Sequence, residues 1–181
     1  MRKITLITGG GRSGKSGQAL SRAGHYGSRA FIATAEPVDG EMRERIARHK
    51  RERADSFMCI EEPLDLAAAL QKVPTGVEAV VIDCLAVWVG NLMHHQPSRE
   101  HEFIERFIDG IGQIAFDLIL VTNEVGMGIV PDNEMSRKYR DLLGTVNQRI
   151  AAVAHEVILM VSGIPLVIKG GYRRPAVQGG N

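Results

Sequence analysis

Short apolar runs alternate with amphipathic or charged stretches along most of this chain. Apolar runs of about four to eight residues between turn signals are typical of buried strands, and apolar positions three or four apart are typical of helices. The runs predict strands at residues 4–7, 29–34, 78–83, 117–122, 156–161 and 165–169, with 56–60 either a short strand or an extended connector. Helical spacing predicts helices from 15 to about 26, from 39 or 40 to about 53, and at 65–73, 99–115 and 134–155. Residues 85–93 are helical or irregular, and 94–98 are a loop. This alternation favours a mainly parallel sheet with helices on both faces.

Length and composition are those of one ordinary globular domain. The 181 residues suit a single domain at 1–169, followed by a tail at 170–181 that lacks periodicity and is expected to be mobile. No apolar run is long enough to cross a bilayer, and the first predicted strand leaves no room for a signal peptide, so we expect a cytoplasmic protein. The net charge of +1 offers no broad positive surface, so nucleic acid is not an expected partner.

Cysteines and most histidines lack the spacing of metal ligands. Cys59 and Cys84 have no C-x-x-C pattern and lie in or beside apolar runs, so we predict that both are reduced, buried and structural. Trp88 lies in an apolar segment that is predicted to be core or a subunit contact. Five histidines are predicted to be structural or solvated: His25, His94, His95, His101 and His155.

Residues 9–16, GGGRSGKS, follow the first predicted strand and fit the phosphate-loop pattern G-x-x-x-x-G-K-[ST]. Glycines let the backbone approach a ligand with successive N–H groups turned toward it. We predict that this loop and the N-terminus of the next helix bind nucleotide phosphates, with Lys15 near the β and γ phosphates and Ser16 ligating Mg²⁺. An ordinary strand-turn-helix corner is the alternative. The expected fold is a single α/β domain that is P-loop NTPase-like and RecA-like.

Other candidate residues follow neighbouring predicted strands. Ligands bind at the carboxyl ends of parallel strands, where the sequence places the phosphate loop, residues 34–36, Asp83 and residues 123–128. A carboxylate at the end of a buried strand needs a cation or a hydrogen bond, so we predict that Asp83 is a second Mg²⁺ ligand. The alternative is that Asp83 caps the N-terminus of the next segment.

The predicted helix at 40–53 carries the only histidine that we single out. Met42, Ile46, His49 and Arg53 share one of its faces, and the other positions are mostly charged. His49 is therefore expected to face the protein beside the cations of residues 50–53, which would bind a triphosphate. By pattern alone, a histidine at the edge of an apolar stripe is more often a packing or surface residue than a catalytic one.

The sequence also narrows the class of nucleotide protein. A signalling GTPase is disfavoured, because residues 123–126 read NEVG where a guanine-reading N-K-x-D would fit. A small-molecule kinase that uses ATP without a covalent histidine remains an alternative. A non-enzymatic nucleotide-dependent binding protein is another.

Several segments together resemble one family. They are the phosphate loop, IAT before Ala35, EMRERIARHK, VVIDCLAVWVGNL, TNEVGMGIVP, RKYRDLLGTVNQ and VSGIPLVIK, in order from about residue 4 to 169. In these segments the chain resembles the bifunctional adenosylcobinamide kinase / adenosylcobinamide-phosphate guanylyltransferase of cobalamin biosynthesis. The TNEVGMGIVP and GTVNQ blocks are much more specific than the phosphate loop.

The resemblance implies two reactions on one domain. Adenosylcobinamide is phosphorylated by ATP or GTP, and its phosphate then receives GMP from GTP, which gives adenosylcobinamide-GDP and pyrophosphate. The second reaction passes through a GMP-histidine intermediate, which the resemblance assigns to His49. Lys15 also acts on the phosphates, Mg²⁺ is the implied cofactor, and a homo-oligomer, expected to be a trimer, is the implied assembly, with the segment around Trp88 as a candidate contact.

The resemblance also implies a set of nucleotide contacts. Glu61 is matched by its distance from His49, and Glu62 is the alternative. The set is Gly9, Gly10, Gly11, Arg12, Ser13, Gly14, Lys15, Ser16, Ala33, Thr34, Ala35, Lys50, Arg51, Glu52, Arg53, Glu61 and Asp83, with Ser16 and Asp83 also on the metal.

Overall fold

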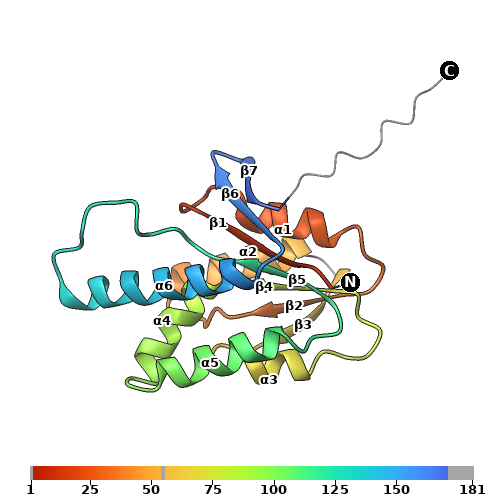
Figure 1. Ribbon diagram of the computed structural model, residues 1–181, viewed down its shortest axis with the longest axis horizontal. Coiled ribbons are helices and arrows are strands. Elements are labelled where there is room, and N and C mark those ends of the chain that lie inside the picture. The colour runs from red at the N-terminus through yellow and green to blue at the C-terminus, as the bar shows by residue number, and fades with distance from the viewer. Residues whose placement is uncertain (1, 54–55, 171–181) are drawn as a thin grey trace.

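Strands and helices alternate in the computed structural model of the chain, which describes residues 2–53 and 56–170 (Figure 1). The strands are β1 (Ile4–Gly9), β2 (Arg29–Ala33), β3 (Met58–Glu61), β4 (Ala79–Asp83), β5 (Asp117–Val121), β6 (Glu156–Val161) and β7 (Ile164–Lys169). The helices are α1 (Lys15–Ala23), α2 (Gly40–Arg53), α3 (Leu66–Gln71), α4 (Leu85–His95), α5 (Glu100–Ile111) and α6 (Glu134–Val153). The expected order of elements is therefore confirmed, and the stretch at 56–61 is a strand.

All strands belong to one seven-stranded sheet in the order β3-β2-β4-β5-β1-β6-β7. Every neighbouring pair is parallel except β6 and β7, which form an antiparallel hairpin. The prediction of a mainly parallel sheet is confirmed. Since β5 lies between β1 and β4, the phosphate loop and Asp83 follow strands that are not direct neighbours.

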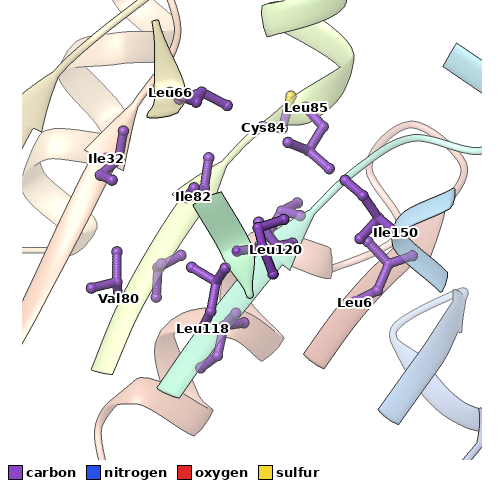
Figure 2. Close-up of a cluster of buried hydrophobic side chains, with 14 of the residues drawn as sticks. Leu6, Ile32, Leu66, Val80, Ile82, Cys84, Leu85, Leu118, Leu120 and Ile150 are labelled. Carbon is purple, nitrogen blue, oxygen red and sulfur yellow. The ribbon is translucent and has the colours of Figure 1, made fainter. Parts of the chain in front are cut away.

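Alternating side chains of the strands are buried on both faces of the sheet, and the buried residues form one hydrophobic cluster. On one face, buried residues such as Leu6, Ile82 and Leu120 pack beneath Leu66 of α3 and Ile150 of α6 (Figure 2). Contacts between α3 and α5 and between α4 and α6 place these four helices together on that face. The opposite face is covered by α1 and α2. Helices thus cover both faces, as the sequence predicts, because a fully parallel interior has no face that can be left to water.

Differences from the predicted boundaries and burial have local causes. Helix α4 continues through His94 and His95, which were expected in a loop, and α5 ends at Ile111, before Gly112. Trp88 is fully buried, packs edge-on against Phe107 and donates its indole N–H to Leu64 O at 2.7 Å. Trp88 itself is therefore core, which is one of its two predicted roles, and the subunit contact suggested for the segment around it stays a prediction.

Burial of the two cysteines differs. Cys84 is buried as predicted, but Cys59 is exposed, so its predicted burial is wrong. Cys59 lies on β3, which is an edge strand of the sheet with one neighbour only. Among the residues that the structure describes, no helix is both long and apolar enough to span a bilayer. The predicted tail, apart from Gly170, lies outside the described residues.

Candidate active site

Several of the predicted site residues lie in one row across the sheet. Glu61 is level with Ala33, Ala33 with Asp83, and Asp83 with Val121. Val121 is in turn level with Ile7, two residues before the phosphate loop begins. Side chains at the same level of a parallel sheet point to the same face. Glu61, Ala33 and Asp83 therefore share one face of the sheet with the end of β1.

That face is the one covered by α1 and α2. Thr5 is two residues before Ile7 and therefore lies on the same face of the sheet. Helix α1 lies next to Thr5 on that face, because Arg22 of α1 and Thr5 both bond to Glu156. Met42 and Ile46 of α2 line a pocket with Ala33 and Asp83. The sequence therefore brings the phosphate loop, its helix and the histidine-bearing helix α2 to one side of one sheet edge.

The phosphate loop has the backbone geometry that its glycines predict. Gly14 caps α1 in a left-handed conformation with φ +92°, and Gly9 has φ +146°. A Cβ at Gly9 would lie only 2.4 Å from Met160 O, so a side chain cannot be accommodated there without moving β6. On its outer side the loop is held by Gly163, whose N–H donates to Ser13 O at 3.1 Å.

Lys15 is the first residue of α1, and its side chain folds back over the loop. Its Nζ donates to Gly10 O at 2.6 Å and lies 3.5 Å from Ser13 Oγ, and the residue is only 7% exposed. The ammonium group is thus held within the loop, while Gly10, Gly11 and Arg12 are exposed to solvent. An anion that approaches this loop meets backbone N–H groups, the N-terminus of α1 and the Lys15 cation.

Asp83 is not the N-cap of the next helix, so this alternative prediction is wrong. Cys84 caps α4, since its Sγ accepts from Val87 N at 3.5 Å. No hydrogen bond or ion pair joins the Asp83 carboxylate to another residue in the described part of the chain. An unpaired carboxylate at this edge and the Ser16 hydroxyl are oxygen donors of the kind that Mg²⁺ uses with substrate phosphates. The described residues hold no cluster of three or more His, Cys, Asp or Glu, so an all-protein metal cage is not present among them.

Thr34 anchors the segment between β2 and α2. Its hydroxyl accepts from Cys84 N and donates to Cys84 O, both at 2.9 Å, and the residue is fully buried. Asn91 Nδ2 donates to Thr34 O at 2.8 Å. Thr34 is bonded to Cys84 and to Asn91 of α4, whereas its neighbours Ala33 and Ala35 line the pocket. Two residues on, Glu36 Oε2 lies 2.8 Å from Nε2 of His95, which therefore has a structural contact as predicted.

Helix α2 closes one side of the pocket. Met42, Ile46 and Lys50 of this helix face Phe31, Ala33, Ala35, Glu61, Asp83, Cys84 and Val87. Of the predicted inward stripe of Met42, Ile46, His49 and Arg53, the positions of Met42 and Ile46 are confirmed, and Lys50 lines the pocket one turn further along the helix. The pocket is open to solvent on one side and its volume is about 50 Å³.

Lys50 and Glu61 join α2 to the end of β3. Their Nζ and Oε1 atoms are 2.7 Å apart, at the rim of the pocket. Glu62 instead accepts from the N–H groups of Leu64 and Asp65 and lies 3.4 Å from Lys72 Nζ. Of the two predicted alternatives, Glu61 faces the pocket and Glu62 supports the turn before α3.

The remaining predicted site residues lie on α2. Arg51 is exposed. His49 lies on the helix between Ile46 and Lys50, and Glu52 and Arg53 end it. The side chains of His49, Glu52 and Arg53 lie outside the described part of the chain.

A hydrogen-bonded group of polar residues lies at the end of β5. The sequence predicts only that residues 123–128 lie at the carboxyl edge of the sheet. Thr122 Oγ1 donates to Asn147 Oδ1 at 2.7 Å, and Asn147 Nδ2 donates to Asn123 O at 3.0 Å. The only signal in the sequence is polar residues directly after the buried run 117–121. A pattern in one strand cannot show that Asn147, from a helix 25 residues further on, meets them.

Comparison with solved structures supports the fold. The RadB recombinase matches with a TM-score of 0.52 at 15% identity, over 95% of this chain and 83% of that one. The Pyrococcus horikoshii protein PH0250 matches with a TM-score of 0.56 at 8% identity, over 94% of this chain and 88% of that one. The RadB match agrees with the expected RecA-like, P-loop NTPase-like fold.

Sequence comparison gives relatives over nearly the whole chain. The bifunctional adenosylcobalamin biosynthesis protein CobP of Pseudomonas aeruginosa is 40% identical over 167 residues, covering 91% of this chain and 96% of that protein. The corresponding protein CobU of Salmonella typhimurium is 39% identical over 182 residues, covering 92% and 99%. The model of the cobinamide kinase / cobinamide phosphate guanyltransferase family matches residues 5–168. The chain therefore belongs to the cobinamide kinase / cobinamide phosphate guanyltransferase family.

Proposed function

We propose that this protein carries out both reactions in cobalamin biosynthesis. It phosphorylates adenosylcobinamide with ATP or GTP, and it transfers GMP from GTP to the resulting phosphate through a GMP-histidine intermediate on His49. The observation that carries this proposal is the position of α2. This helix bears His49 and packs over the pocket beside Asp83, on the same face of the sheet as the phosphate loop.

In the kinase step, the phosphate loop and Lys15 hold the triphosphate. The hydroxyl of the substrate's aminopropanol arm attacks the γ phosphorus and releases its proton to solvent, and the bond from that phosphorus to the β-phosphate oxygen breaks. A nucleoside diphosphate leaves. Positioning and charge stabilisation supply most of the catalysis in such transfers. The loop amides, the Lys15 ammonium and the α1 N-terminus all direct positive charge at the phosphates.

Magnesium fits the oxygen donors of this site. Ser16 and Asp83 would hold it together with the nucleotide phosphates, and when bound it would neutralise charge on the β and γ oxygens.

In the transferase step, a neutral His49 imidazole attacks the α phosphorus of GTP. An N–P bond forms, the bond from the α phosphorus to the bridging oxygen breaks, and pyrophosphate leaves. The phosphate of adenosylcobinamide phosphate then attacks the same phosphorus, which gives adenosylcobinamide-GDP and restores the imidazole. Lys50 follows His49 directly and lines the pocket, so its ammonium can offset charge on the phosphate during transfer.

We also propose the cytoplasm as its compartment, since ATP and GTP are its substrates, and a homo-oligomer, with a trimer expected from the family resemblance. Support for assembly comes from apolar side chains that the chain leaves exposed in the loop between β5 and α6. These are Met127, Ile129 and Val130, which are 80%, 97% and 60% exposed.

Covalent labelling tests the proposal. Protein incubated with GTP labelled at the α phosphate and quenched in denaturant should retain acid-labile label, and His49→Ala should retain none. His101→Ala is a matched control, because His101 is exposed on α5. Kinase turnover without label in the wild type would favour a single-activity kinase. Absence of both turnover and label would favour a non-enzymatic nucleotide-binding protein.

A further inference from the structure

Asn123 follows β5, the strand that lies between β1, which leads into the phosphate loop, and β4, which ends at Asp83. The pairing of β5 with β1 continues past the assigned end of β5, because Thr122 N donates to Ile7 O at 2.9 Å and Glu124 N donates to Gly9 O at 3.1 Å. In this ladder Asn123 is level with Gly9, the first residue of the phosphate loop. On its other side, Asp83 of β4 is level with Val121.

The side chains on either side of Asn123 show which face it occupies. Thr122 Oγ1 bonds to Asn147 of α6, so Thr122 faces the α6 side of the sheet. Successive residues of an extended segment face opposite sides. Asn123 therefore shares the face of Val121 and Asp83, which is the face of the phosphate loop and α2.

The backbone of Asn123 is fixed, but its amide is available. Asn147 Nδ2 donates to Asn123 O at 3.0 Å. In the described part of the chain, no hydrogen bond engages the Asn123 side-chain amide, although the residue is partly buried. Its neighbour Glu124 faces the other side, and its carboxylate accepts from Gly126 N at 2.7 Å. Asn123 is thus the polar side chain that the central strand presents toward the phosphate site.

We propose that the Asn123 Nδ2 group donates a hydrogen bond to a γ-phosphate oxygen of the bound nucleoside triphosphate. An amide suits this place because it donates without adding charge to a site that already holds a lysine and a carboxylate. The contact distinguishes a triphosphate from a diphosphate. In the kinase reaction, which rests on the proposed function, it also stabilises charge on the phosphoryl group as it transfers.

Binding of two nucleotides tests this contact without any turnover. Calorimetry should show that Asn123→Ala binds a non-hydrolysable GTP analogue roughly tenfold more weakly than wild type, and GDP with unchanged affinity. Asn123→Asp keeps the shape but replaces the donor by a negative charge, so its affinity for the analogue should fall further. Thr122→Val is the matched control: it removes the bond to Asn147 on the opposite face and should leave the ratio of the two affinities unchanged.

Two results would overturn the proposal. One is an unchanged affinity of Asn123→Ala for the triphosphate analogue. The other is an equal loss for analogue and GDP, which would show that Asn123 only supports the shape of the site. Kinase turnover of Asn123→Ala should fall by about a hundredfold, and labelling of His49 by less, because the γ phosphate is not the reacting group there. If wild type shows no kinase turnover, the proposed function fails, and the affinity ratio still decides the role of Asn123.

Discussion

The ammonium of Lys50 lies 2.7 Å from the carboxylate of Glu61, so one ion pair joins the histidine-bearing helix α2 to the edge of the sheet. The two side chains are 53% and 68% exposed, and exposed pairs contribute about 1 kcal/mol or less. We therefore expect Lys50→Ala and Glu61→Gln to change the free energy of unfolding by less than about 1 kcal/mol. Urea unfolding measures this.

The same variants should alter the site. Lys50→Ala removes a cation from the pocket, so formation of the GMP-histidine adduct should slow by roughly tenfold or more. Quench-flow labelling gives that rate, and Lys138→Ala, in an exposed pair on α6, is the control. Large destabilisation with unchanged labelling would instead make the pair a structural clamp.

Gly9 is the position where the phosphate loop least tolerates a side chain. A Cβ there would meet Met160 O at 2.4 Å, at a φ of +146° that L residues rarely adopt. Gly9→Ala should lower the free energy of unfolding by more than about 1 kcal/mol and abolish nucleotide binding. Gly144→Ala is the matched control, because Gly144 is exposed within α6 and no atom lies near its added methyl. That variant should be more stable by about 0.5–1 kcal/mol. Equal stability of the two variants would contradict the close approach of β1 and β6.

Local patterns predicted the elements and the backbone geometry of the glycine loop well, because hydrophobic periodicity and glycine placement act within one segment. The strand-loop-helix order at residues 4–23, the inward positions of Met42 and Ile46, and the strand before Asp83 all follow from such patterns. Strand order does not, since it is set by how helices far apart in sequence pack on the sheet. The position of β5 between β1 and β4, and with it the place of Asn123, is therefore visible only in the structure.

Exposure was the less predictable property. Cys59 lies in an apolar run but on an edge strand, and a run does not reveal which strands lie at an edge. The sequence leaves Trp88 open between core and subunit contact, because its indole N–H finds a backbone partner, Leu64 O, on a loop that a sequence pattern does not place beside it. Glu61 and Glu62 are adjacent, and only the register of β3 shows which one faces the pocket.

Lys15 should be essential for binding triphosphate. Its ammonium is held at Gly10 O within the loop, where an incoming phosphate gains a charge-assisted hydrogen bond. Lys15→Ala should weaken binding of a triphosphate analogue by at least tenfold and slow both reactions. Calorimetry and the two activity assays check this. Unchanged turnover would contradict the assignment of the phosphate loop.

Assembly should depend on the exposed loop between β5 and α6. Ile129 is 97% exposed, and a charge there would be desolvated at a subunit contact. Ile129→Asp should lower the mass measured by light scattering from that of the oligomer to that of one chain. Val153→Asp, at another partly exposed apolar position, should leave the mass unchanged. If Ile129→Asp has the mass of wild type, this loop is not the contact.

Acid should weaken the anchor that holds α1 behind the phosphate loop. Glu156 on β6 is 5% exposed, and its carboxylate lies 2.6 Å from Arg22 of α1 and 3.0 Å from Lys3. Burial by itself raises the pKa of Glu156, but hydrogen bonds from Arg22 and Lys3 together outweigh burial, so the pKa lies below its ordinary value.

A carboxyl whose pKa is lower in the folded than in the unfolded chain stabilises the fold above its unfolded pKa, and this contribution is lost as pH falls through the folded pKa. Glu156→Gln should therefore cost about 3 kcal/mol at pH 7, because it leaves the partly buried Arg22 guanidinium without its counter-ion. The difference between wild type and variant should shrink as pH falls below about 4. Urea unfolding at pH 7 and pH 3 measures both, and Glu105→Gln, in an exposed pair with Arg149, should show a much smaller loss. A loss of the same size at both pH values would mean that Glu156 acts through its packing and not through its charge.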